Sequence, residues 1–141
     1  MNIRDFAHRP VVVGAGLAGL RAALGLQPEP VLLVTSGTLE SGAASLWSQG
    51  GIAAAIGADD DAGLHAADTI AAGDGLCDQA IAARITAAAP AIIEELIRLG
   101  AAFDRDASGR VALGLEAAHG RRRIAHAGDR TGLMLTAALA R

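Results

Sequence analysis

Cysteine and aromatic residues are scarce in this chain of 141 residues, and lysine is absent, so that all 12 basic residues are arginine. Cys77 is the only cysteine, which excludes a disulfide framework and a cysteine-based zinc cluster. The formal net charge of −3 argues against a nucleic-acid-binding protein, whose surface is usually strongly basic. We interpret the missing lysine, together with abundant alanine, as a bias of genome composition.

Long hydrophobic runs are missing too. No stretch of about 18 uncharged apolar residues is present, so we expect no transmembrane helix. Pro10–Leu26 is apolar but is interrupted by Arg21 and by glycines, which argues against a signal-peptide core. With one thiol and no export signal, we expect a cytoplasmic protein. The 52% hydrophobic content and the ordinary length predict one folded domain.

The first part of the chain has the pattern of a βαβ unit. Arg9–Val13 and Val31–Val34 are short β-branched apolar runs and predict buried parallel strands. Between them, an apolar helical stretch ends near Gly25, and Gln27–Pro30 predicts a turn because neither proline can continue a helix. We therefore predict an α/β fold with a Rossmann-like FAD/NAD(P)-binding domain, incomplete, in which helices follow the N-terminal βαβ unit.

Helical patterns dominate the rest of the sequence. We expect a helix through His65 and Ile70, with Asp59–Asp61 at its start, and a second helix capped by Asp78 whose apolar period runs to Leu99. Their charged and capping residues mark where each helix begins.

Four further features complete this outline. Pro90 predicts a kink or two abutting helices, Gly100 a helix end, and Phe103–Gly114 a turn with a short strand. Asp129 or Thr131 is expected to cap a last helix. Because that helix stops within its pattern after only two parallel strands, we expect residues 1–141 to be the N-terminal part of a larger domain, with later strands, a capping domain and a C-terminal helical domain beyond residue 141.

One glycine motif carries a mechanism. Gly14, Gly16 and Gly19 form Gly-x-Gly-x-x-Gly directly after a strand and at the start of a helix, where a tight turn lets a pyrophosphate approach the helix N-terminus. This context favours dinucleotide binding over a purely structural turn. The acidic residue that usually meets the adenosine ribose is missing from Val34–Gly37, which argues against an ordinary NAD dehydrogenase.

The segment Ala44–Ala54 resembles the flavin-contacting segment of the fumarate reductase/succinate dehydrogenase flavoproteins. Within that family the chain is similar to the branch that oxidises L-aspartate. The segments that carry this similarity are His65-x-x-Asp68-Thr69, Ala72-Gly73-x-Gly75-Leu76-Cys77-Asp78, Phe103-Asp104-Arg105, Glu116-x-x-His119, Arg122-Arg123-Ile124-x-His126-Ala127 and Asp129-x-Thr131-Gly132.

The resemblance implies noncovalent FAD. The respiratory enzymes attach FAD through a histidine five residues before Gln49, a position that is Ala44 here. Ser36 stands where the family often has lysine, and Trp47 is expected to pack beside the cofactor segment. The residues implied in FAD binding are Gly14, Ala15, Gly16, Leu17, Ala18, Gly19, Ser36, Ala44, Ser45, Leu46, Trp47, Ser48, Gln49, Gly50 and Gly51.

The resemblance also implies a substrate side. Glu116 and His119 are implied in substrate binding and His126 in lining the site, while Ala117–Ala118 replaces the family's usual Gly-Gly. A carboxylate at Glu116 would attract the substrate ammonium. No catalytic residue is assigned within the chain, because the family's catalytic arginine is expected beyond residue 141.

The implied reaction is FAD-dependent oxidation of L-aspartate to iminoaspartate, by hydride transfer from Cα to the flavin N5, with oxygen or fumarate as the acceptor. It would be the first step of quinolinate and NAD biosynthesis, with L-aspartate as the small-molecule substrate and quinolinate synthase as a downstream partner. Neither a nucleic acid nor a membrane is expected as a partner. The alternatives are another flavoprotein of the fumarate reductase type and a non-catalytic, truncated nucleotide-binding fragment.

Three other features have plain interpretations. Asp59–Asp61, His65 and Asp68 suit helix capping and a solvated face better than a metal site, so no metal is assigned. Arg121–Arg123 suits a surface face or partners for carboxylates better than a phosphate site. Cys77 is expected to be a small buried thiol.

Overall fold

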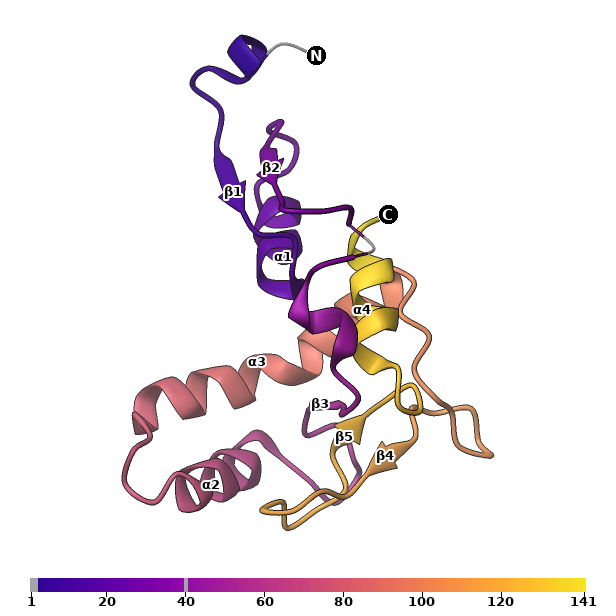
Figure 1. Ribbon diagram of the computed structural model, residues 1–141. Coiled ribbons are helices and arrows are strands. Elements are labelled where there is room, and N and C mark those ends of the chain that lie inside the picture. The colour runs from indigo at the N-terminus through magenta and orange to yellow at the C-terminus, as the bar shows by residue number, and fades with distance from the viewer. Residues whose placement is uncertain (1–2, 40) are drawn as a thin grey trace.

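The computed structural model describes residues 3–39 and 41–141 (Figure 1). Two short 3₁₀ helices, η1 and η2, accompany five strands and four α-helices in the described residues. In chain order the elements are η1 (Ile3–Phe6), β1 (Val11–Val13), α1 (Leu17–Gly25), β2 (Leu32–Val34), η2 (Ala44–Trp47), β3 (Ile52–Ala53), α2 (Ala62–Ala72), α3 (Gln79–Arg98), β4 (Leu113–Gly114), β5 (Ile124–Ala125) and α4 (Thr131–Leu139).

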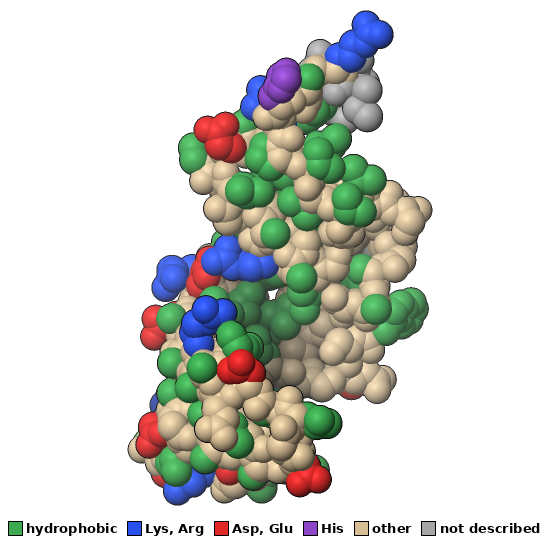
Figure 2. Space-filling view, turned by 90° about the vertical axis from the view of Figure 1, so that its left-hand side faces the viewer, with side chains coloured by type: hydrophobic (Ala, Val, Ile, Leu, Met, Phe, Trp, Pro, Cys, Tyr) green, Lys and Arg blue, Asp and Glu red, His purple; other side chains and the backbone are tan. Residues whose placement is uncertain are grey.

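The βαβ unit is confirmed. β1 and β2 pair in parallel, with Val12 opposite Leu33, and α1 connects them. The expectation that both strands are buried is wrong, because Val13 is 80% exposed and Val34 is 43% exposed. Among the described strands each has only the other as a neighbour, so the outer edge of each strand has no partner strand there. Figure 2 shows hydrophobic side chains over this upper part of the molecule.

α4 packs against α1 and η2, and so joins the βαβ unit to the rest of the chain (Figure 1). The predicted cap of this helix is wrong. Arg130 holds the N-cap position, and no side chain of the described residues caps it. Thr131 is instead the first helical residue, and its Oγ1 accepts a hydrogen bond of 3.0 Å from the Ala127 N–H, which ties the helix to the preceding loop.

α2 and α3 lie against each other (Figure 1). Asp61 and Asp78 cap them, each accepting a hydrogen bond of 2.9 Å from the backbone N–H three residues on, as the sequence predicts for Asp78 and for the Asp59–Asp61 run. α3 continues through Pro90 as one helix of 20 residues, so the alternative of two abutting helices is wrong. Its end is a Schellman turn in which Gly100 has a φ of 95°.

β3, β5 and β4 form an antiparallel sheet, with β5 in the centre. The turn and short strand predicted from Phe103–Gly114 are present, since Arg105 bridges Val111 before β4 begins. The main hydrophobic core lies between this sheet, α3 and α4. Its most deeply buried members include Ile93, Phe103 and Ala125.

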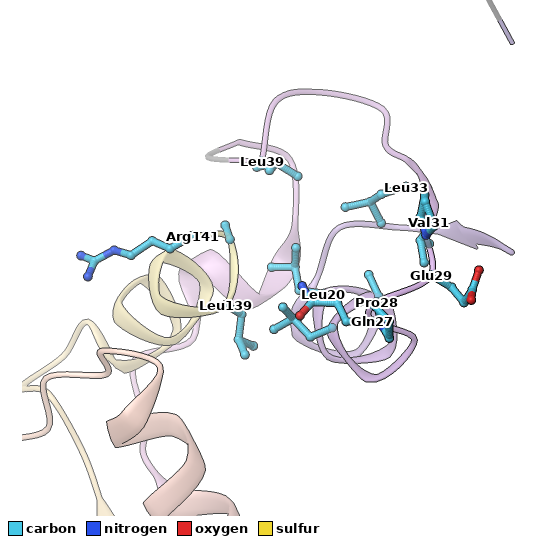
Figure 3. A pocket seen from close by; sticks show the side chains of 13 residues that line it. Leu20, Gln27, Pro28, Glu29, Val31, Leu33, Leu39, Leu139 and Arg141 are labelled. Carbon is cyan, nitrogen blue, oxygen red and sulfur yellow. The ribbon is translucent and has the colours of Figure 1, made fainter. Parts of the chain in front are cut away.

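A mainly apolar hollow of about 540 Å³ lies between α1, β2 and the end of α4 (Figure 3). Leu20, Leu33, Leu39 and Leu139 are among the residues that line it. Among the described residues that line it, none belongs to the set predicted to bind FAD, so this hollow is separate from the candidate site. In the described part of the chain, no helix is long and apolar enough to cross a membrane.

Candidate cofactor and substrate site

The glycine motif forms the turn between β1 and α1. Gly14 has a φ of 101°, a conformation that side chains rarely adopt, and its N–H donates to the Val34 carbonyl at 2.8 Å. A Cβ at Gly19 would overlap the Gly14 carbonyl oxygen, so the third glycine allows the helix to lie directly on the turn. The first and third glycines therefore have the structural roles that the spacing predicts: Gly14 forms the tight turn and Gly19 allows close packing.

The start of α1 suits an anion. Gly16 is its N-cap and, being glycine, has no side chain to cap the helix. A Cβ at Gly14 would meet no described atom within 4 Å, so open space adjoins the turn before the helix, whereas a Cβ at Gly16 would lie 3.2 Å from Ser45 Oγ. Backbone N–H groups and the helix dipole favour negative charge at such an end. The turn thus fits the pyrophosphate of a dinucleotide.

η2 docks on this turn. The Leu17 N–H donates a hydrogen bond of 3.2 Å to Ser45 Oγ, which joins the predicted FAD segment to the first residue of α1. On its other side the Gly132 N–H donates to the Ser48 carbonyl at 2.9 Å, and a Cβ at Gly132 would overlap the Ser45 carbonyl oxygen. Two distant parts of the predicted cofactor set are therefore brought together.

The same segment runs on to the candidate substrate side. A Cβ built on Gly50 would lie 3.8 Å from Glu116 Oε1, so the Glu116 carboxylate stands beside the Gln49–Gly51 backbone. Pairing of β3 with β5, and of β5 with β4, creates this neighbourhood, because β3 follows Gly51 and Glu116 follows β4. His119 is joined to Glu116 by a backbone hydrogen bond of 3.2 Å from its N–H to the Glu116 carbonyl.

A buried ion cluster lies behind His119. The Arg123 side chain is fully buried and forms a two-pronged pair with Asp60, with Nε–Oδ2 and Nη2–Oδ1 distances of 2.8 Å. Arg123 Nη1 lies 2.7 Å from Asp68 Oδ2, and the Gly120 N–H donates to that same oxygen at 2.7 Å. Such bidentate, charge-assisted bonds are among the strongest in proteins.

The pKa values in this cluster follow its charges. Burial works against ionisation of Asp60, but the hydrogen bonds and charge of Arg123 outweigh it and lower the pKa of that carboxyl. The Gly120 amide, and then Arg123, lower the pKa of Asp68. Hydrogen bonding to Asp60 raises the pKa of Arg123. All three groups are therefore charged at neutral pH.

His65 is the uncharged member of the cluster. It is buried, and its ring meets the His119 ring edge-on at a centroid distance of 5.7 Å. Burial, with the positive charge of Arg123 adding to it, lowers the pKa of His65. Its Nδ1 has no hydrogen-bond partner among the described residues.

Several expectations about single residues need correction. Trp47 is 82% exposed rather than packed, because η2 presents its ring to solvent. Cys77 is only partly buried, with its thiol 3.5 Å from the Thr69 carbonyl. Asp60 and His65 are not part of a solvated face, since a buried guanidinium faces them. No cluster of potential metal ligands occurs in the part of the chain that the structure describes.

The Asp60–Asp68–Arg123 cluster is what the sequence interpretation missed. The sequence predicts carboxylate partners for the arginine run, and this is confirmed for Arg123. Its partners are Asp60 and Asp68, for which the sequence instead favours helix capping and a solvated face. His65 and Asp68 lie three residues apart in α2 and so share one face of it, which was the available signal. Nothing in the sequence around Asp60, which precedes α2, indicates that its carboxylate pairs with Arg123.

Comparison with known proteins agrees with this geometry. A family model described as an FAD binding domain matches residues 9–141, and the chain belongs to that family. FAD is accordingly the cofactor of the domain, and the Rossmann-like fold prediction is confirmed.

Two curated relatives are named L-aspartate oxidase. The relative from Agrobacterium fabrum is 58% identical over 130 residues, which cover 92% of this chain and 25% of the relative. The relative from Mesorhizobium japonicum is 54% identical over 139 residues, which cover 98% of the chain and 27% of the relative. The chain thus spans about a quarter of the length of these relatives and is similar to their N-terminal portion.

Solved structures show the same fold. The Mycobacterium smegmatis Sdh1 complex in its apo form matches with a TM-score of 0.87 and 34% identity, covering 93% of this chain and 23% of the other. Escherichia coli quinol fumarate reductase matches with a TM-score of 0.85 and 28% identity, covering 94% of this chain and 23% of the other.

Proposed function

We propose that this chain forms the FAD-binding and part of the substrate-binding surface of an enzyme that oxidises L-aspartate to iminoaspartate. The observation that carries the proposal is the position of the Glu116 carboxylate beside the Gly50 backbone, within the segment implied in flavin contact. Two supporting facts are the family of FAD-binding domains and the relatives named L-aspartate oxidase.

The cofactor-binding residues we propose are the glycine turn, Gly14 to Gly19, with Ser36 and the segment Ala44 to Gly51. The turn and the α1 N-terminus would hold the pyrophosphate, and Ser45 fixes the segment to the helix start. Ala44 leaves no side chain that could form a covalent bond to the cofactor. When bound, FAD supplies the acceptor for the hydride that leaves the substrate.

The protein groups would bind and orient an amino dicarboxylate. The Glu116 carboxylate is exposed and would attract the substrate ammonium, favouring L-aspartate over succinate, which has no ammonium group. His119 would face a substrate carboxylate. We further propose a cytoplasmic enzyme that acts before quinolinate synthase in NAD biosynthesis, with oxygen or fumarate as acceptor and with its catalytic residues beyond residue 141.

The test uses protein expressed from the complete reading frame and loaded with FAD. Peroxide release with L-aspartate is compared with reduction of a dye acceptor by succinate. Turnover of L-aspartate, lost selectively in Glu116→Gln, supports the proposal. Turnover of succinate in place of L-aspartate assigns the protein to the respiratory type that the solved structures represent, and flavin binding without either activity supports a non-catalytic module.

A further inference from the structure

Asp68 connects α2 to the segment 115–122, which carries the proposed substrate ligands Glu116 and His119. It lies on α2, and its Oδ2 accepts hydrogen bonds from both the Gly120 N–H and Arg123 Nη1, each at 2.7 Å. Gly120 directly follows His119, so this carboxylate holds the segment 115–122 at the residue next to a proposed substrate ligand. Arg123 itself stays fixed by its two bonds to Asp60.

The segment 115–122 depends on such an anchor. Its ends are fixed by β4 and β5, and the Arg123 N–H donates to the Gly114 carbonyl at 3.1 Å. Between those ends Glu116 to Ala118 are exposed, and Ala118 has a φ of 69°, a left-handed conformation that alanine disfavours. A strained, exposed segment keeps one shape only where surrounding contacts impose it.

Arg123, which Asp60 and Asp68 hold in place, also orients His119. Arg123 Nη1 lies 3.3 Å from His119 Nδ1, and a guanidinium can only donate. His119 Nδ1 is therefore the acceptor, and in the neutral ring the proton is on Nε2. That leaves Nε2–H as a donor for a carboxylate oxygen.

We propose that Asp68 is a positioning residue for the substrate side: anchored by Arg123, it holds Gly120 and thereby fixes Glu116 and His119 where a dicarboxylate binds. This inference rests on the proposed function, because it takes an amino dicarboxylate as the ligand of Glu116 and His119. Asp68 itself does not touch the substrate.

The test compares Asp68→Ala, Asp68→Asn and Asp61→Ala in the FAD-loaded protein from the complete reading frame. Asp61 caps the same helix but is bonded to Leu64 rather than to the segment 115–122, so Asp61→Ala is the matched control for weakening of α2. We expect Asp68→Ala to raise KM for L-aspartate about tenfold, the effect expected from losing the charge-assisted hydrogen bond that holds the Gly120 N–H, with a smaller change in kcat and unchanged FAD affinity. Asp68→Asn, which keeps an oxygen for the Gly120 N–H, should recover most of this loss.

Hydrogen exchange supplies a readout that needs no activity. Amides in 115–122 should exchange faster in Asp68→Ala than in the wild type and in Asp61→Ala. Unchanged exchange overturns the inference whether or not L-aspartate is a substrate. A raised KM in Asp61→Ala equal to that in Asp68→Ala also overturns it, whereas absence of L-aspartate turnover in the wild type refutes the proposed function alone.

Discussion

The two ends of the candidate site are built by opposite means. The cofactor end, around β1, α1 and η2, depends on side chains that are absent: Gly14 allows a left-handed turn and Gly19 allows close contact of helix and turn. The substrate end, around α2 and β5, depends on a charged side chain that is fully buried, Arg123, with two carboxylates as its partners. The first end offers open backbone to a ligand, and the second fixes a loop.

This difference follows from the task of each end. A pyrophosphate needs backbone N–H groups that it can approach closely, which any Cβ would hinder. A loop that presents side chains to a small substrate needs fixed geometry, and a satisfied network of buried charges provides it. Such a network is costly to break, because removal of one member leaves another charged and buried.

The largest effect is expected from Arg123→Met. The substitution leaves Asp60 without its counter-ion at a position where its side chain is inaccessible, and the free energy of unfolding should fall by about 3–5 kcal/mol. Urea denaturation of the full-length protein measures this. Arg122→Met at the exposed neighbouring position should change it by less than about 0.5 kcal/mol, and equal effects of the two would contradict a buried network.

The second prediction concerns the glycine turn of the cofactor end. Gly19→Ala places a Cβ against the Gly14 carbonyl, so we expect a destabilisation of about 1–3 kcal/mol together with weaker FAD binding. Gly25→Ala is the matched control in the same helix, where the new Cβ would lie 3.6 Å from Arg21 Nη1, an ordinary contact. It should keep FAD affinity and stabilise slightly. Flavin fluorescence titration measures the FAD affinity of both variants. Tight FAD binding by Gly19→Ala would contradict the proposal that the glycine turn holds the pyrophosphate.

The same contrast explains what could be predicted from sequence. The cofactor end is encoded locally, since three glycines within six residues, flanked by a strand and a helix, define its shape. The starts of α2 and α3 are also encoded locally, since Asp61 and Asp78 cap these helices as the sequence predicts, whereas the predicted cap of α4 is wrong. Glu116 is predicted to lie on the substrate side only through the family resemblance, and its position beside Gly50 has no local signal because pairing of β3, β5 and β4 depends on contacts distant in sequence.

Two kinds of failure have physical causes. Burial of Val13 was predicted from its apolar run, but burial requires a neighbouring layer, which a local pattern cannot supply. The role of Asp60 was missed for the related reason that its partner, Arg123, is far away in sequence, so an acidic residue beside a helix start indicated only a cap or solvent.

The pH dependence of stability tests whether His65 is buried and uncharged at the substrate end. The pKa of His65 is lowered in the folded protein, so below its ordinary value of 6.5 the unfolded chain binds a proton that the folded chain resists. Stability should fall as pH drops from about 6.5 towards the lowered pKa, by at most about 1.4 kcal/mol per pH unit. Asp60 and Asp68 do not titrate in this window, because their pKa values lie below 3.8. His65→Gln should flatten the curve between pH 7 and 5, and an unaltered slope would exclude His65 as its source.

The smallest expected effect concerns the junction where η2 meets α1. Ser45→Ala removes the oxygen that accepts the Leu17 N–H, leaving an N-terminal amide of α1 to water or ligand, at a cost of about 1 kcal/mol. Ser41→Ala, which removes a hydroxyl bonded only to exposed Thr38 among the described contacts, serves as the control and should change stability by less than about 0.5 kcal/mol. If bound FAD restores Ser45→Ala to wild-type stability, the cofactor itself joins η2 to the helix start. If it does not, the Ser45 hydroxyl is what holds the cofactor segment in place, and the cofactor end also depends on one side chain.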